Sequence, residues 1–194
     1  NDETSTNWIP AIQLGNGAKL NLILGGENTL KGGDQCAAID VPEGCTLTIS
    51  GEGSLKATGG VGAGIGASSM RKGSLGTIEI NGGNIEAYGS GMAAGIGGGL
   101  EGGIGTIVIN GGTVYAKGGY GSYPKDINHV YGGAGIGGGP FGCVDKIEIN
   151  GGNVTACAGY VTNAKRRPGA AIGTGGGGAK PIGEGKYKYG DIVI

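Results

Sequence analysis

The sequence is poor in the residues that build metal centres and catalytic sites. One histidine is present among 194 residues, aromatic residues make up 5%, and none of the four cysteines belongs to a C-x-x-C pair. A zinc site is therefore not expected, because zinc takes its ligands from clustered cysteine and histidine. The formal net charge of −1 predicts no basic surface for nucleic acid or an anionic membrane. No apolar run reaches the roughly 18 residues of a transmembrane helix.

Glycine, in contrast, is abundant, with 51 residues. Such a content usually indicates a low-complexity, disordered chain. Here the glycines recur with a period, and hydrophobic residues still make up 38% of the chain. We therefore expect a folded core that is narrow and built from small aliphatic side chains.

Three short apolar segments recur in a fixed order. The first centres on one isoleucine: Ile12, Ile39, Ile65, Ile96, Ile136 and Ile172. The second alternates apolar, polar, apolar: Leu20–Leu22, Leu47–Ile49, Ile78–Ile80, Ile107–Ile109, Ile147–Ile149 and Ile192–Ile194. The third repeats this alternation: Leu30, Leu55–Ala57, Ile85–Ala87, Val114–Ala116 and Val154–Ala156. Alternation with period two is typical of a strand with one buried face.

Equivalent segments share one direction and one pattern, so stacking like on like pairs them in parallel. Three strands in each coil give a three-sided cross-section. We therefore predict an all-β fold, a right-handed three-sided parallel β-helix (solenoid) of about five to six coils. It forms a single domain over residues 1–194, which we expect to be a piece of a larger protein.

The glycines have structural roles in this fold. The motif N-G-G follows the second strand at residues 81–83, 110–112 and 150–152, where Asn-Gly supplies the positive φ of a tight corner. Stacked asparagines are expected to form a hydrogen-bonded ladder. The G-A-G-I-G corners are expected to allow close backbone approach. Neither a Walker loop nor a strand-turn-helix dinucleotide motif surrounds these glycines.

The cysteines leave two alternatives open. Cys36 with Cys45, and Cys143 with Cys157, are near enough in sequence for local disulfides. Each pair brackets strands, however, which can hold the two sulfurs too far apart. The other alternative is buried thiols that act as small hydrophobic side chains.

Catalytic groups are sparse, and we expect no enzyme activity, no catalytic residue and no cofactor. A hydrolase needs two convergent carboxylates. The two outward acids at equivalent positions, Glu79 and Glu148, are separated by the coil that carries Val108, which places them roughly 10 Å apart. The single histidine, His129, has no evident catalytic partner. Calcium is the one cofactor left open, without support, because the acids are scattered and no D-x-D-x-D-G sequence occurs.

The repeat lengthens in three places, at residues 118–132, 158–170 and 178–189. The first two leave the same corner, after the third strand, so stacking places them side by side. They contain the predicted ligand-binding residues: Tyr120, Tyr123, Tyr131, Tyr160, Lys165, Arg166 and Arg167. Tyrosine and arginine on exposed loops of a rigid scaffold are typical of a recognition surface. The alternative is that these side chains only cover and solubilise the solenoid.

The repeat includes the run GTIEINGGNIEAYGSGMAAGIGGG and its partial copies GTIVINGGTVYAKGG and KIEINGGNVTA. On these residues it resembles the glycine-rich repeats of large surface proteins of gut Firmicutes. It is also similar to bacterial carbohydrate-binding β-helix domains first described as polygalacturonate binders, which carry calcium in acidic loops. The resemblance covers roughly residues 36–176. It implies secretion and attachment to the bacterial cell surface.

We therefore expect a non-catalytic binding module that is adhesin-like or carbohydrate-binding. Two partner classes stay open at this point: a polysaccharide or glycan, and a host secreted protein such as mucin or immunoglobulin. No nucleic acid and no membrane insertion is expected. A purely structural stalk is a third alternative, and an enzyme on a β-helix scaffold is the fourth.

Overall fold

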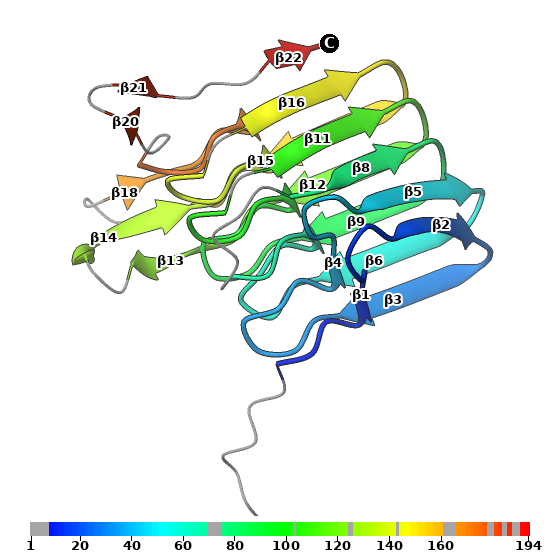
Figure 1. The fold of residues 1–194 in the computed structure, drawn as a ribbon, viewed down its shortest axis with the longest axis horizontal. Helices are drawn as coiled ribbons and strands as arrows, with labels where there is room; N and C mark the ends of the chain where they lie inside the picture. The colour runs from blue at the N-terminus through cyan, green and yellow to red at the C-terminus, as the bar shows by residue number, and fades with distance from the viewer. Residues whose placement is uncertain are drawn as a thin grey trace, which may run out of the picture.

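The computed structural model describes residues 8–69, 75–102, 104–123, 126–142, 144–160, 166–177, 181–183, 186–187 and 191–194. The chain winds into a solenoid of three parallel sheets, with each coil stacked on the one before it (Figure 1). The predicted three-sided parallel β-helix is confirmed. The described residues include no helix that is long and apolar enough to cross a membrane.

The first sheet consists of six two-residue strands, one from each coil. They are β1 (Ile12–Gln13), β4 (Ile39–Asp40), β7 (Ile65–Gly66), β10 (Ile96–Gly97), β15 (Ile136–Gly137) and β19 (Ile172–Gly173). Each isoleucine pairs in register with the isoleucine of the next coil. The first predicted segments therefore form one continuous parallel ladder.

The second and third sheets contain longer strands. The second consists of β2 (Lys19–Leu24), β5 (Thr46–Gly51), β8 (Thr77–Ile80), β11 (Ile104–Ile109), β16 (Val144–Ile149) and β22 (Asp191–Val193). The third consists of β3 (Glu27–Lys31), β6 (Ser54–Thr58), β9 (Asn84–Tyr88), β12 (Thr113–Lys117) and β17 (Asn153–Cys157). Neighbouring strands in both sheets stack in sequence order (Figure 1).

The core is a set of aliphatic columns that run along the solenoid axis. In the second sheet, Ile78, Ile107 and Ile147 lie in register, and none is more than 1% exposed. In β6, Leu55 is buried and the neighbouring Lys56 is exposed, as the period-two pattern predicts. Burying one such isoleucine stabilises the fold by about 1.5–3 kcal/mol.

Glycine at the end of the first-sheet strands lets the coils approach each other closely. Gly66 has a φ of +139°, and a Cβ added there would collide with the carbonyl oxygen of Gly97 in the next coil. Gly137 has a φ of +136° and meets Gly173 in the same way. The predicted close approach at these corners is confirmed.

The predicted asparagine ladder is also present. The side-chain amide of Asn110 donates to Oδ1 of Asn81 at 2.7 Å, and that of Asn150 donates to Oδ1 of Asn110 at 2.9 Å. In each N-G-G motif it is the second glycine that adopts the positive φ, as at Gly83 (+88°) and Gly112 (+87°). The ladder therefore marks the corner between the second and third sheets.

The first two insertions lie side by side, as predicted. Residues of the first form an antiparallel hairpin of β13 (Tyr120–Tyr123) and β14 (Asp126–Gly132). The second insertion contributes β18 (Arg166–Arg167), which pairs in parallel with β14 and places Arg167 opposite Tyr131. In the third insertion, β20 (Pro181–Gly183) and β21 (Lys186–Tyr187) form an antiparallel pair.

The cysteines follow the thiol alternative. Cys36 and Cys45 are both buried thiols, and Cys157 is a thiol as well. The thiol of Cys45 donates to the carbonyl oxygen of Gly15 at 2.7 Å. Cys143 lies outside the described residues. A disulfide between Cys36 and Cys45 is therefore not part of this fold.

Alanine at Gly66 tests the close packing of the coils. We expect Gly66→Ala to lower the free energy of unfolding by about 2 kcal/mol or more, because a strained φ alone costs about 1–3 kcal/mol. The matched control is Gly15→Ala, since a Cβ at Gly15 meets nothing within 4 Å. Urea denaturation of both variants measures the difference, and equal effects would contradict the role given to the corner.

Candidate binding face

Two of the predicted ligand-binding tyrosines are exposed and follow equivalent strands of neighbouring coils. Tyr120 begins β13 and is 56% exposed, and Tyr160 follows β17 and is 63% exposed. Strands β12 and β17 pair with Lys117 opposite Cys157, and each tyrosine follows three residues later. The glycines before them, Gly119 and Gly159, approach closely, since a Cβ added at Gly159 would meet the Gly119 carbonyl oxygen. The two tyrosines therefore leave neighbouring coils at the same corner.

The other predicted residues lie mainly on the small sheet of the insertions. Tyr123 is the last residue of β13 and Arg166 is the first of β18. Arg167 is exposed, and its guanidinium carbon lies 5.8 Å from the centroid of the Tyr131 ring. Lys165 lies outside the described residues.

Tyr131 was predicted to belong to the exposed recognition loops, and this is wrong. Its side chain is 2% exposed, and its ring centroid lies 5.2 Å from that of Phe141. The reason is that the insertion packs onto the turn that carries Phe141, so the ring is enclosed between this turn and Arg167. Tyr131 therefore fastens the insertion to the solenoid.

Two tyrosines that the sequence analysis did not select stand on the third sheet. Tyr115 lies between the buried Val114 and Ala116 of β12 and points outward. Tyr88 is the last residue of β9, and its ring lies 5.8 Å from that of Tyr115, tilted by 52°. The signal was present in the sequence, because the period-two alternation directs both residues to the outer face.

A groove of about 430 Å³ lies between Tyr88 of the third sheet and Tyr120 of the first insertion. Tyr88, Lys117 and Tyr120 line it, together with the turns at 89–91 and 118–119. Lys117 stands directly opposite Tyr88 in the strand register. We call five residues that lie on the outer side of the third sheet, or follow its strands in the chain, the tyrosine face: Tyr88, Tyr115, Lys117, Tyr120 and Tyr160.

Charged neighbours orient the rings of this face. The Lys56 ammonium lies 5.5 Å from the centroid of the Tyr88 ring, and the Tyr88 hydroxyl donates to the Glu86 carboxylate at 3.0 Å. Burial, and then the bond to Glu86, raises the pKa of Tyr88 above its ordinary value of 10.0. The hydrogen bond with the Cys157 thiol, and then burial, raises the pKa of Tyr115. Both phenols are therefore neutral hydrogen-bonding groups at physiological pH.

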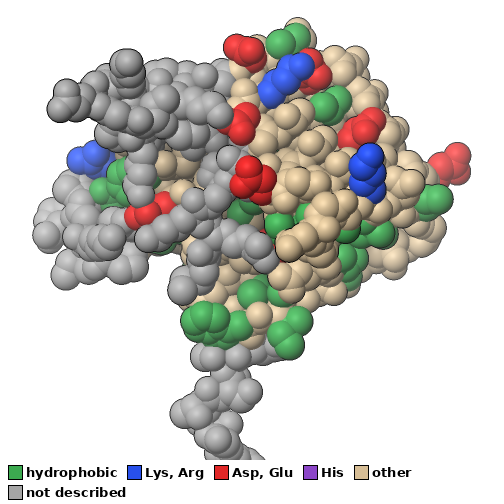
Figure 2. All heavy atoms as spheres, viewed as in Figure 1, with side chains coloured by type: hydrophobic (Ala, Val, Ile, Leu, Met, Phe, Trp, Pro, Cys, Tyr) green, Lys and Arg blue, Asp and Glu red, His purple; other side chains and the backbone are tan. Residues whose placement is uncertain are grey.

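Lysine or arginine side chains and aspartate or glutamate side chains are both scattered over the described part of the face that Figure 2 shows.

The acids considered for catalysis have structural partners. Val108 stands opposite both Glu79 and Glu148 in the strand register, as predicted. Glu148 forms an ion pair with Lys146 at 2.6 Å, and Glu79 accepts a hydrogen bond from the Asn110 amide at 3.3 Å. Within the described ranges, no group of three His, Cys, Asp or Glu residues could hold a metal ion.

The raised pKa of Tyr88 makes a prediction for alkaline stability. The folded chain holds this proton more tightly than the unfolded chain does. The resulting stabilisation is fully present below about pH 10 and is lost as the pH rises through the raised folded pKa. We therefore expect Tyr88→Phe to lose less stability than wild type between about pH 8 and pH 11, measured by urea denaturation. Identical losses in the two proteins would contradict this assignment.

The comparisons with known proteins agree with the fold. The family model described as beta helix repeat matches residues 47–69, 78–100, 107–123 and 147–176. Each of the first two matches runs from a second-sheet strand, β5 or β8, to the next first-sheet strand, and so spans one coil. No curated protein and no solved structure matches the chain. The repeat match and the three parallel sheets together support a β-helix family for this chain.

Proposed function

We propose that this chain is a non-catalytic binding module of a bacterial cell-surface protein, and that the tyrosine face holds a glycan. The observation that carries the proposal is the groove lined by Tyr88, Lys117 and the exposed Tyr120, with the exposed Tyr160 on the neighbouring coil. The residues that resemble bacterial surface repeats support the placement on the cell surface.

The chemistry of the face suits a sugar chain. Aromatic rings offer flat apolar area with little loss of conformational freedom, and tyrosine adds a hydroxyl at the ring edge. A sugar ring has an apolar face of C–H groups and a rim of hydroxyls, so it can pack on a ring and bond to a phenol or to Lys117. Tyr120 and Tyr160 follow equivalent strands of neighbouring coils. This arrangement suits a ligand that extends along the solenoid axis.

The rigid scaffold supports binding rather than catalysis. The strands beneath the face are held by parallel ladders and a buried core, so the rings are preorganised and little entropy is lost on binding. Glu79 and Glu148, the two acids that a hydrolase could use, stand on the second sheet, whereas the tyrosine face belongs to the third sheet and the insertions.

Alanine variants of the tyrosine face test the proposal on a glycan array. We expect Tyr120→Ala and Tyr160→Ala each to weaken binding of the captured glycan about tenfold, which corresponds to about 1.4 kcal/mol. Ile23→Ala is the matched control, because Ile23 is 75% exposed but lies at the corner between the second and third sheets in the first coil. Circular dichroism confirms that each variant folds.

Three outcomes would count against the proposal. The tyrosine variants could bind the glycan as well as wild type does. The module could bind no glycan and instead retain a mucin or immunoglobulin from host secretions through the same tyrosines, which would show a protein ligand. Polysaccharide turnover that is lost in Glu79→Gln or Glu148→Gln would show an enzyme.

A further inference from the structure

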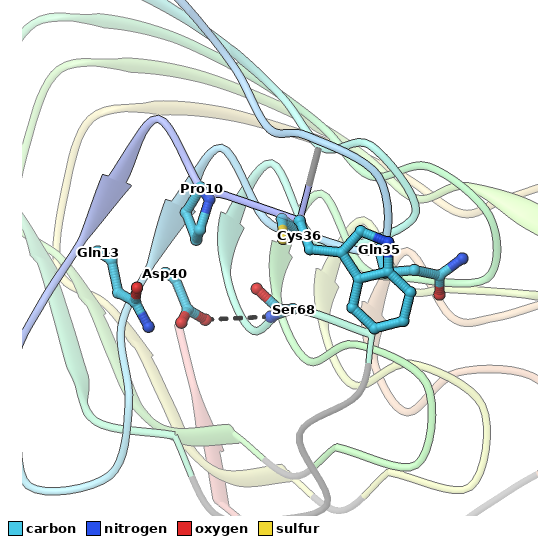
Figure 3. Close-up of a pocket in the computed structure, with 7 residues that line it drawn as sticks. Pro10, Gln13, Gln35, Cys36, Asp40 and Ser68 are labelled. Atoms are coloured by element: carbon cyan, nitrogen blue, oxygen red, sulfur yellow. Dashed lines mark hydrogen bonds between the residues drawn. The ribbon is translucent and has the colours of Figure 1, made fainter. Parts of the chain in front are cut away.

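A second cavity lies at the N-terminal end of the solenoid, on separate residues from the tyrosine face. It has a volume of about 280 Å³, and its lining includes Trp8, Pro10, Gln13, Asp40 and Ser68. Figure 3 shows Gln13, Asp40 and Ser68 along one side of the cavity, with Pro10 and Cys36 on another. Hydrophobic side chains also gather where the described chain begins (Figure 2), and Trp8 there is 51% exposed.

The cavity exists because the first coils depart from the repeat. Asp40 pairs with Gln13 on one side and with Gly66 on the other, and every later coil has glycine at this position: Gly97, Gly137 and Gly173. In the next coil, Ser68 follows Gly66 by two residues, and the corresponding residues of the later coils are Gly99, Gly139 and Gly175. Two neighbouring coils therefore carry a polar side chain, Asp40 or Ser68, at a position where the later coils have glycine.

These polar groups are held in place at a cost in desolvation. The Asp40 carboxylate is 1% exposed, and its Oδ1 accepts a hydrogen bond from the Ser68 N–H at 3.1 Å (Figure 3). The Ser68 hydroxyl oxygen accepts from the Ala37 N–H at 3.1 Å. Burying a carboxylate is unfavourable even when it is hydrogen-bonded, and glycine at both positions is compatible with the fold in the later coils. What distinguishes these two positions is that their polar side chains line the cavity.

The backbone beside the cavity is strained at one residue, which also indicates a ligand site. Gln35, which also lines the cavity, has a φ of +62°. A residue other than glycine in this conformation costs of the order of 1–3 kcal/mol, and such residues cluster at ligand sites. Strain, a buried carboxylate and an exposed indole thus meet around one cavity.

The lining selects a ligand with one apolar face and a hydroxylated edge. Trp8 and Pro10 supply an apolar wall, and half of the indole surface is open to be covered. The same cavity is lined by the exposed Gln13 amide, which both donates and accepts, and by the Ser68 hydroxyl, which keeps its own proton to donate. Pockets of this type bind small ligands through apolar contact and a few placed polar groups.

We propose that this cavity is a second ligand site and that it takes one pyranose ring. The C–H face of the sugar packs against Trp8, and two of its hydroxyls bond to Gln13 and Ser68. Asp40 is a positioning residue that holds Ser68. The site does not depend on the tyrosine face and stands even if that face binds no glycan.

The tryptophan provides a direct test, because Trp8 is the single tryptophan of the chain. Its fluorescence is titrated with methyl glycosides of glucose, galactose and mannose and with N-acetylglucosamine. We expect a saturable change in Trp8 emission with at least one of these sugars at millimolar concentration. In Asp40→Gly and Ser68→Gly the same sugar should bind at least about tenfold more weakly, a difference of about 1.4 kcal/mol.

The two glycine variants restore the residues of the later coils, so they are expected to fold, and their thermal unfolding checks this. The double variant Tyr120→Ala/Tyr160→Ala should keep the full Trp8 response, which separates this site from the tyrosine face. The proposal is overturned if no pyranoside changes the Trp8 emission, or if both glycine variants respond to the sugar as wild type does. It is also overturned if a quaternary ammonium salt, tetramethylammonium chloride, gives the saturable response and no sugar does.

Discussion

Every other feature of this molecule depends on the stacking of like residues in register from coil to coil. The isoleucines of the first sheet meet their counterparts through all six strands, and the second and third sheets repeat this pairing with Leu, Ile, Val and Ala. Parallel pairing at about 4.8 Å brings identical side chains into contact. The core is only as wide as one side chain from each of three walls, so no coil is stable without its neighbours.

This constraint explains the glycine content and also limits where function can develop. Where coils approach at Gly66 or Gly137, the space that a Cβ needs is already occupied by backbone. Side chains for recognition are therefore confined to outward strand positions, to insertions at the corners, and to the first coils, where Asp40 and Ser68 replace glycine. The tyrosine face uses the first two of these places, and the N-terminal cavity uses the third.

The sequence analysis was most accurate where a residue's neighbours are copies of itself. The inward positions of Ile78, Ile107 and Ile147 and the ladder from Asn81 to Asn150 follow directly from the repeat. The adjacency of the first two insertions follows as well, because they leave the same corner. The analysis failed to select Tyr88 and Tyr115, although alternation alone directs them outward, because it searched for function only where the repeat lengthens.

The sequence by itself therefore determined the parallel three-sided solenoid, its core positions and its corner glycines, because these depend on contacts between equivalent residues. The tertiary structure alone decided the contacts between unlike residues. Tyr131 is buried because the insertion meets Phe141, and the Trp8 cavity exists because the entering chain lies beside Gln35 and Ser68. No period relates these partners, so their meeting depends on the path of each turn in space.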